Sequence, residues 1–242
     1  MNIRNKLMLG FLISVITPIV LLCIITGNNI KKDSLRDFYE YTHSELSVIE
    51  KSLSIFMDDI KENSVMLAKF PDVLNINRDM TSFINEKSSK TMADFSRGLD
   101  EQRIVNFLNT VKISHKNYVE VYMGTKFGSF IDGDKSLKIP AGFDPRVRPW
   151  YKKSLLTPNK PSLTKAYQSF TGEAVVAVSH AVSAKDNVKG VIGFDVSLHD
   201  LTKFISNIRI GKTGYVMLIQ DDGVILADPG HDDTGFKKLE ET

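Results

Sequence analysis

The sequence predicts an α+β protein with an N-terminal transmembrane helix, a long stalk helix, a module built on an antiparallel sheet, and the beginning of a second module. Three observations predict this arrangement. A charge-free apolar segment lies near the N-terminus, a long apolar stripe at helical spacing follows it, and from Tyr118 onward the hydrophobic period changes to two. The composition agrees, because 42% apolar and 25% charged residues are typical of a protein with a hydrophobic core.

The transmembrane helix is predicted over residues 7–30, which contain no charged side chain. About 20 apolar residues suffice to cross a hydrocarbon core of roughly 30 Å. A cleaved signal peptide is the alternative, but no small-residue cleavage pattern follows the segment. Basic residues flank the segment on both sides, so charge alone does not orient it. Because the tail at residues 1–6 is so short, we expect it in the cytoplasm and the bulk of this single-pass chain outside the cell membrane.

Residues 31–70 are predicted to form the stalk helix, about 60 Å long at 1.5 Å per residue. It follows the membrane segment directly and is expected to end at Phe70, before Pro71. Its stripe alternates in steps of three and four: Tyr39, Thr42, Leu46, Ile49, Leu53, Phe56, Ile60, Asn63 and Leu67. Such a stripe packs either on the chain's own domain or on a partner helix. We expect a parallel homodimer near the membrane, where no domain covers the stripe.

The sheet module is predicted over residues 61–209. An amphipathic helix is indicated by Ile104, Phe107, Leu108 and Val111. About five antiparallel strands follow, in residues 118–123, 128–134, 162–169, 173–183 and 187–198, with a turn at "KDN" and then a short helix. We expect the helices on one face of the sheet.

Residues 210–242 predict the first hairpin of a second module. Because a two-stranded hairpin cannot bury a face alone, we expect the chain to be truncated there. The alternative is a hairpin that packs on a partner.

Several classes of function are excluded by what the sequence contains. The net charge is only +2 and no basic stripe is present, so nucleic-acid binding is not expected. The single cysteine permits neither an internal disulfide nor a cysteine metal site, and the five histidines are dispersed. No nucleophile with its base, and no cofactor fingerprint, is present. We therefore expect neither an enzyme nor a bound metal or cofactor.

The stretch "DPRVRPWY" is the strongest candidate for a binding site. It places Arg148, Trp150 (the only tryptophan) and Tyr151 together on a segment braced by prolines. The guanidinium suits a carboxylate, and the aromatic faces can hold a cation. We expect this segment to be a loop that covers the sheet face opposite the helices.

That face is expected to hold space and a charge. In "GVIGFDVS", Asp195 shares its face with Gly193 and Val191, while Tyr122 and Tyr167 lie on neighbouring strands. Asp195 would attract an ammonium group, so the predicted ligand is a small zwitterion such as an amino acid. The alternative is structural.

In the structural alternative, Trp150 is a core aromatic and Arg148 pairs with Asp195 or Asp144. Composition alone favours the structural alternative.

In this combination the sequence resembles the double Cache sensor domain. The motifs that carry the resemblance are "DPRVRPWY", "AYQSFTGEAVVAVSHAV", "GVIGFDVSL" and "GYVMLIQDDGVILADP", and they cover nearly the whole chain after the membrane segment. The resemblance implies the extracytoplasmic part of a bacterial chemoreceptor (a methyl-accepting chemotaxis protein), with a PAS-like membrane-distal module at 61–209 and an incomplete membrane-proximal one at 210–242. The sensor of a histidine kinase or cyclic-dinucleotide enzyme, and a non-signalling interaction module, remain alternatives.

The resemblance also implies roles for individual residues. Arg148 and Trp150 would hold a ligand carboxylate, Tyr151, Tyr167 and Asp195 would hold its ammonium, and Tyr122 would line the pocket. Family members that bind amino acids commonly carry Asp two residues after the later tyrosine, where this chain has Ser169. This departure weakens one ammonium partner and leaves other small amines or carboxylates as candidates.

Overall fold

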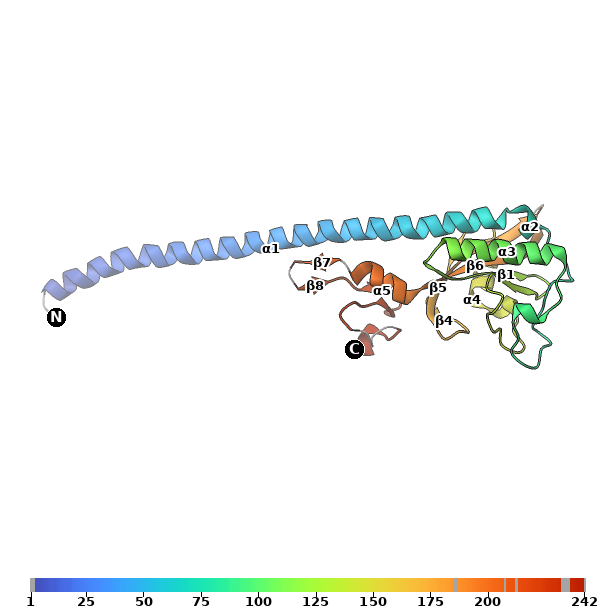
Figure 1. The fold of residues 1–242 in the computed structure, drawn as a ribbon. Coiled ribbons are helices and arrows are strands. Elements are labelled where there is room, and N and C mark those ends of the chain that lie inside the picture. Colours follow the sequence, from blue (N-terminus) through green and yellow to red (C-terminus); the bar gives the residue numbers. More distant parts are fainter. Residues whose placement is uncertain (1–2, 185–186, 207, 212, 232–235, 242) are drawn as a thin grey trace. The chain divides into compact units, whose positions relative to one another are not determined.

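The computed structural model describes residues 3–184, 187–206, 208–211, 213–231 and 236–241 (Figure 1). Lys185 and Asp186 of the predicted turn, and the ends of the first and last predicted segments, lie outside the described residues. The chain divides into two compact units, Met1–Ser54 and Ile55–Thr242.

Helix α1, Ile3–Ala68, is continuous over 66 residues and joins the predicted membrane and stalk segments without a break. It contains a window of mean hydropathy 2.8, so by length and composition it can cross a membrane. The helix ends at Ala68, two residues before the predicted end, and Pro71 opens the short helix α2, Pro71–Leu74. A proline at this first position is tolerated because its missing N–H would lack a partner there.

The last part of the stalk stripe packs on the chain's own domain. Ile60 and Leu67 are buried, and Asn63 donates a 2.9 Å hydrogen bond to the Tyr118 hydroxyl. These residues lie in the second unit, together with the sheet. Packing on the own domain is therefore confirmed for this end of the stripe, and the dimer nearer the membrane stays a prediction.

The centre of the second unit is an antiparallel sheet of six strands, one more than predicted. Its order is β2-β1-β6-β5-β3, and β4 also pairs with β5. The strands are β1 Tyr118–Thr125, β2 Phe130–Asp132, β3 Ser162–Leu163, β4 Tyr167–Gln168, β5 Ala174–Ala184 and β6 Asn187–Ser197.

The prediction of one continuous strand at 162–169 was wrong. This segment forms two separate strands, β3 and β4. The Thr164 hydroxyl accepts the Ala177 N–H at 2.9 Å, so a side chain takes the place of a ladder carbonyl between the two strands.

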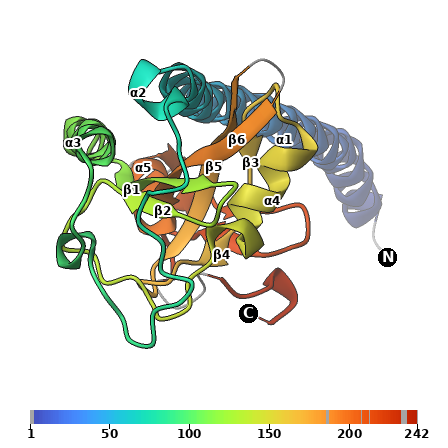
Figure 2. The ribbon, with the colours of Figure 1, turned by 90° about the vertical axis from the view of Figure 1, so that its right-hand side faces the viewer.

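Helices cover both faces of the sheet, which corrects the expectation of one covered face. The end of α1 reaches Tyr118, whose register partner is Val196. Helix α4, Pro149–Leu156, lies beside β5 and β3 (Figure 2). The Ser154 hydroxyl of α4 donates to the Ser179 hydroxyl of β5. Ser179 is the register partner of Gly193, which lies on the opposite face of β6 from Val196.

The segment 144–151, which was expected to be a loop, instead contains two helical elements. A 3₁₀ turn, η2 Pro145–Val147, leads into α4. Prolines open both elements, and the Asp144 carboxylate accepts the Arg146 N–H at the start of η2. Two prolines placed at helix starts favour this path because their fixed φ suits a first helical turn.

The remaining helix predictions are confirmed. Helix α3, Leu99–Ser114, flanks β1 and β2, buries Ile104 and Leu108, and stacks Phe107 on Phe70 at 3.8 Å between ring centroids. A 3₁₀ turn, η1 Met92–Asp94, interrupts the loop before it.

Beyond β6 lie α5 Leu198–Ser206, β7 Arg209–Ile210, β8 Gly214–Tyr215, β9 Leu218–Ile219, β10 Ile225–Ala227 and η3 Leu239–Glu241. The β9-β10 hairpin is present as predicted. Its Ile225 and Ala227 are buried and β10 contacts α5, so the hairpin buries a face after all.

Candidate functional site

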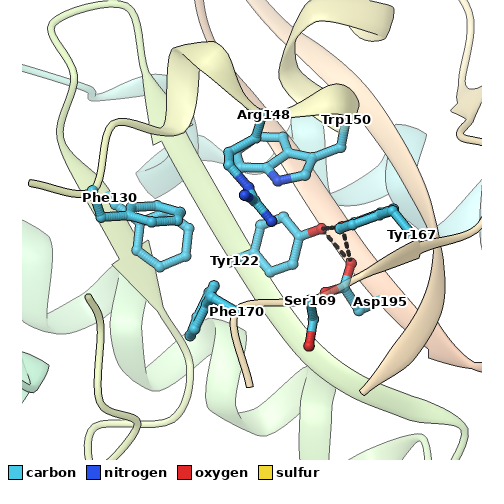
Figure 3. Close-up of a pocket in the computed structure, with 9 residues that line it drawn as sticks. Tyr122, Phe130, Arg148, Trp150, Tyr167, Ser169, Phe170 and Asp195 are labelled. Atoms are coloured by element: carbon cyan, nitrogen blue, oxygen red, sulfur yellow. Dashed lines mark hydrogen bonds between the residues drawn. The ribbon is translucent and has the colours of Figure 1, made fainter. Parts of the chain in front are cut away.

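A small cavity of about 10 Å³ lies on the sheet face that α4 covers (Figure 3). Six of the seven predicted site residues line it, together with three phenylalanines that the sequence did not predict. The lining consists of Tyr122, Phe130, Phe143, Arg148, Trp150, Tyr167, Ser169, Phe170 and Asp195. Strands β1, β2, β4 and β6 and helix α4 with its start thus converge on one space.

Asp195 is the buried anion of the cavity, with 4% of its surface exposed. Its Oδ1 accepts hydrogen bonds from both the Tyr122 hydroxyl and the Tyr167 hydroxyl, the latter at 2.9 Å (Figure 3). Among the described residues no hydrogen bond reaches its other oxygen, Oδ2. The two tyrosines therefore fix the carboxylate and leave it acceptor capacity for a ligand.

Burial raises the pKa of Asp195 to about 7, although the hydrogen bonds from Tyr122 and Tyr167 lower it. The charge of Glu120 acts upward on this pKa and that of Arg148 acts downward. Burial also raises the pKa of both tyrosines, so that they remain protonated donors. The carboxyl group thus changes its charge near neutral pH.

Gly193 explains the position of Tyr122. The two residues are register partners, and a Cβ on Gly193 would lie 2.6 Å from Cε2 of the Tyr122 ring. The space that the sequence predicted beside Asp195 is therefore present at Gly193, but the tyrosine ring occupies part of it.

Arg148 is the cation of the cavity and stands at the start of α4. Its Cζ lies 5.8 Å from the ring centroids of both Phe143 and Tyr167. Within the described part of the chain it forms no ion pair and no hydrogen bond through its side chain. Asp144 pairs instead with Arg146, at 2.7 Å between Oδ2 and Nη2. Neither pairing in the structural alternative is found, so the guanidinium fork remains available to an anion.

Trp150 is both a core residue and a cavity wall. It is 2% exposed, and its ring centroid lies 4.8 Å from that of Tyr122. Gly124 makes room for it, because a Cβ there would lie 2.8 Å from Cη2 of the indole. The Ser179 hydroxyl donates to the Trp150 carbonyl at 3.1 Å, which holds this turn of α4 against β5.

Of the two remaining predicted residues, Tyr151 lies outside the cavity and Ser169 lines it. Tyr151 is buried but does not line the cavity; its ring packs edge-on against Trp150 at 5.6 Å. On a helix, consecutive residues point about 100° apart, so Trp150 and Tyr151 cannot both face the cavity. Ser169 does line it, with its hydroxyl 2.6 Å from that of Thr171.

The sequence reasoning missed Phe130, Phe143 and Phe170. Phe143 lies 4.7 Å from Phe130 and 5.4 Å from Phe170 between ring centroids, both in edge-to-face geometry. A sequence signal existed for two of them, since Phe143 directly precedes "DPR" and Phe170 directly follows Ser169. Their spatial meeting depends on a fold in which distant loops converge.

A second polar cluster lies beside the cavity without lining it. Asp132 is fully buried, and its Oδ2 has no hydrogen-bond partner among the described residues. Lys112 of α3 contacts Glu120 at 2.8 Å and Asp134 at 3.2 Å. Burial and the neighbouring Glu120 raise the pKa of Asp132 well above its usual value.

In the part of the chain that the structure describes, no group of three or more His, Cys, Asp or Glu side chains could hold a metal ion.

Comparison with known proteins agrees with this geometry. The profile of the Cache domain family matches residues 30–241. A probable methyl-accepting chemotaxis protein of Bacillus thuringiensis subsp. konkukian is 24% identical over 230 residues, which cover 94% of this chain and 31% of that protein. The chemotaxis protein McpG of Pseudomonas putida is 34% identical over 117 residues, which cover 48% of this chain and 18% of that one. The chain thus spans less than a third of the length of these relatives.

A solved structure shares the fold. The ligand-binding domain of the Pseudomonas aeruginosa amino-acid chemoreceptor PctC, in complex with GABA, has a TM-score of 0.57 at 25% identity. The match covers 81% of this chain and 75% of that one. With the family profile matched from residue 30 to residue 241, this chain belongs to the Cache domain family.

Proposed function

We propose that this chain is the ligand-binding part of a bacterial chemoreceptor and that its cavity binds an amino acid or a related small molecule with an ammonium and a carboxylate group. The observation that carries the proposal is the pair of charges in one aromatic-lined cavity. Asp195 is held by two tyrosine hydroxyls, and Arg148 has no ion pair among the described residues. The pair offers opposite charges to the two ends of a zwitterion.

The chemistry of each group suits one end of such a ligand. The planar guanidinium of Arg148 presents parallel N–H donors to a carboxylate. The unpaired Oδ2 of Asp195 accepts from an ammonium, and the faces of Trp150 and Tyr122 add attraction for a cation. Each charge-assisted hydrogen bond contributes roughly 1.5–3 kcal/mol. No step of bond chemistry is required, so the proposed role is binding and not catalysis.

The relatives support this choice. PctC was solved with GABA, which itself carries an ammonium and a carboxylate. The two sequence relatives described above are chemotaxis proteins, which favours a chemoreceptor over the sensor of a kinase or of a cyclic-dinucleotide enzyme.

The membrane arrangement forms part of the same proposal. Residues 7–30 of α1 would span the membrane and carry the binding unit outside the cytoplasm. Exposed apolar side chains in this part of α1 include Leu7, Phe11, Ile16 and Leu22, as a lipid-facing helix requires. The membrane would hold two stalk helices side by side in a homodimer.

A ligand screen of the full chain in detergent micelles tests the proposal. The twenty amino acids, GABA, and matched amines and carboxylates that carry only one of the two charges are added while thermal unfolding is followed. A zwitterion at 100 times its dissociation constant should stabilise the protein by about 2.7 kcal/mol. Shifts produced equally by the single-charge compounds, or by none of the compounds, would contradict the proposal.

A further inference from the structure

We propose that the ligand carries an apolar side chain and that Phe130, Phe143 and Phe170, here called the phenylalanine wall, receive it. This inference rests on the proposed function and narrows it to one class of ligand, the amino acids with aliphatic side chains.

The cavity has two chemically different ends. Figure 3 shows Asp195 and Tyr167 at one end, Phe130 and Phe170 at the other, and Arg148 above the space between them. The distances agree, since the Arg148 guanidinium lies equally far from Tyr167 and from Phe143 of the wall, 5.8 Å in each case. A ligand whose carboxylate meets Arg148 and whose ammonium meets Asp195 therefore directs its third substituent toward the phenylalanine wall.

The wall offers nothing to a polar side chain. The charged groups of the lining are Arg148 and Asp195, and the hydroxyls of Tyr122 and Tyr167 are bonded to Asp195. The one other hydroxyl in the lining is that of Ser169. The Ser169 hydroxyl is already bonded to Thr171 at 2.6 Å. An amide or charged side chain would lose its water without gaining a partner, which is costly. Sites discriminate strongly when a buried polar group is left unpaired.

An apolar side chain gains where a polar one loses. Burial of one methylene is worth about 0.8 kcal/mol, or roughly a fourfold change in affinity. The free space inside this lining is small, about 10 Å³, so a ligand has to displace the side chains around it. We therefore expect short aliphatic side chains to bind more tightly than an indole side chain, which needs a larger displacement.

Calorimetric titration of the full chain in micelles tests the inference. Alanine, 2-aminobutyrate and norvaline form a series that lengthens by one methylene, and glutamine, glutamate and lysine are the polar counterparts. The affinity should rise about fourfold per methylene through the series. Glutamine, glutamate and lysine should bind at least tenfold more weakly than norvaline. Stronger binding of a polar member would overturn the inference and leave the proposed function intact, whereas no binding of any amino acid would overturn both.

Variants of the phenylalanine wall distinguish a role in ligand binding from a role in packing alone. Phe170 is partly exposed, so Phe170→Ala should fold and should lose the gain from alanine to norvaline while it keeps the alanine affinity. Phe170→Arg should shift the preference toward glutamate. Phe127→Ala is the control, because that ring lies outside the cavity and contacts Arg78 and Lys126. An unchanged series in Phe170→Ala would remove that residue from the wall and contradict the inference.

Discussion

Gly193 and Tyr122 face one another on neighbouring strands, and the tyrosine ring occupies the place of a side chain on the glycine, 2.6 Å from where a Cβ would stand. In this position the Tyr122 hydroxyl donates a hydrogen bond to Oδ1 of Asp195. The room at Gly193 is therefore what positions the anion of the cavity.

Gly193→Ala should displace the Tyr122 ring. Overpacking of this kind costs typically 1–3 kcal/mol of stability. Ligand affinity should fall as well, because Asp195 loses an ordered donor. Thermal unfolding and titration of the variant measure the two effects. Gly98→Ala is the matched control, since no atom lies within 4 Å of a Cβ at that position. Equal effects of the two substitutions would argue against the proposed packing.

Binding of an ammonium ligand should weaken as the pH falls below about 7. Burial raises the pKa of Asp195 to about 7, so the carboxyl group becomes neutral below that pH and no longer attracts the ammonium. The affinity should fall by up to about tenfold per pH unit and should level off above pH 7.

Titrations between pH 5.5 and 8 in buffers of different ionisation enthalpy measure both the affinity and the proton released on binding. Asp195→Asn should bind weakly and with little pH dependence. A flat wild-type profile would show that the charge of Asp195 is not used.

The buried carboxyl group of Asp132 should make stability fall as the pH rises. Its pKa is raised in the folded protein by burial and by Glu120, so the folded state keeps a proton that the unfolded state releases above about pH 4. The stabilising contribution is thus present below the unfolded pKa and is lost as the pH rises toward the folded one, by at most about 1.4 kcal/mol per pH unit. Asp132→Asn should therefore gain stability relative to wild type between pH 4 and 8.

Asp134 provides a control of opposite sign. Although burial raises its pKa, the hydrogen bonds from Ser136 and Lys112 lower it overall. Its contribution is present above the unfolded pKa, so Asp134→Asn should lose stability at pH 7 and not at pH 3. Chemical unfolding of both variants across this range checks the two signs. Parallel pH profiles for the two variants would contradict the assignment.

The stalk helices should pair in the membrane-proximal part of the stripe. Single cysteines at Leu46, Ile49 and Leu53, in a Cys23→Ser background, should crosslink between two chains in membranes. Cysteines at the intervening positions should crosslink less, because residues three and four apart share one face of a helix. Crosslinking that does not vary with position would argue against a specific dimer.

The period of the hydrophobic residues was enough to predict most elements of the fold. The strand pattern in "GVIGFDVSL" placed Phe194 and Asp195 on opposite faces, and the register confirms it. The path of "DPRVRPWY" was not predicted correctly, because two prolines can brace a loop or open two helical turns. The interruption of the strand at 162–169 depends on the Thr164 hydroxyl, whose partner lies on another strand.

The sequence predicted those residues of the candidate site whose side-chain type itself indicates a binding role. Arg148, Trp150 and Asp195 were identified from charge, shape and strand face, and all three line the cavity. The phenylalanine wall was not identified, because its members come from β2 and two separate loops and resemble ordinary core residues. Tyr151 was assigned through the family resemblance, and helix geometry turns it away from the cavity.

The most direct test of the account is the affinity of the full chain for its best amino acid, measured by calorimetry in wild type and in Arg148→Ala. Removal of the guanidinium should weaken binding about ten- to a hundred-fold. The melting temperature should change little, since the side chain of Arg148 forms no ion pair among the described residues. Arg146→Ala, two residues away and paired with Asp144, should leave the affinity unchanged. An Arg148→Ala variant that binds as tightly as wild type would contradict the central claim that Arg148 holds the ligand's carboxylate.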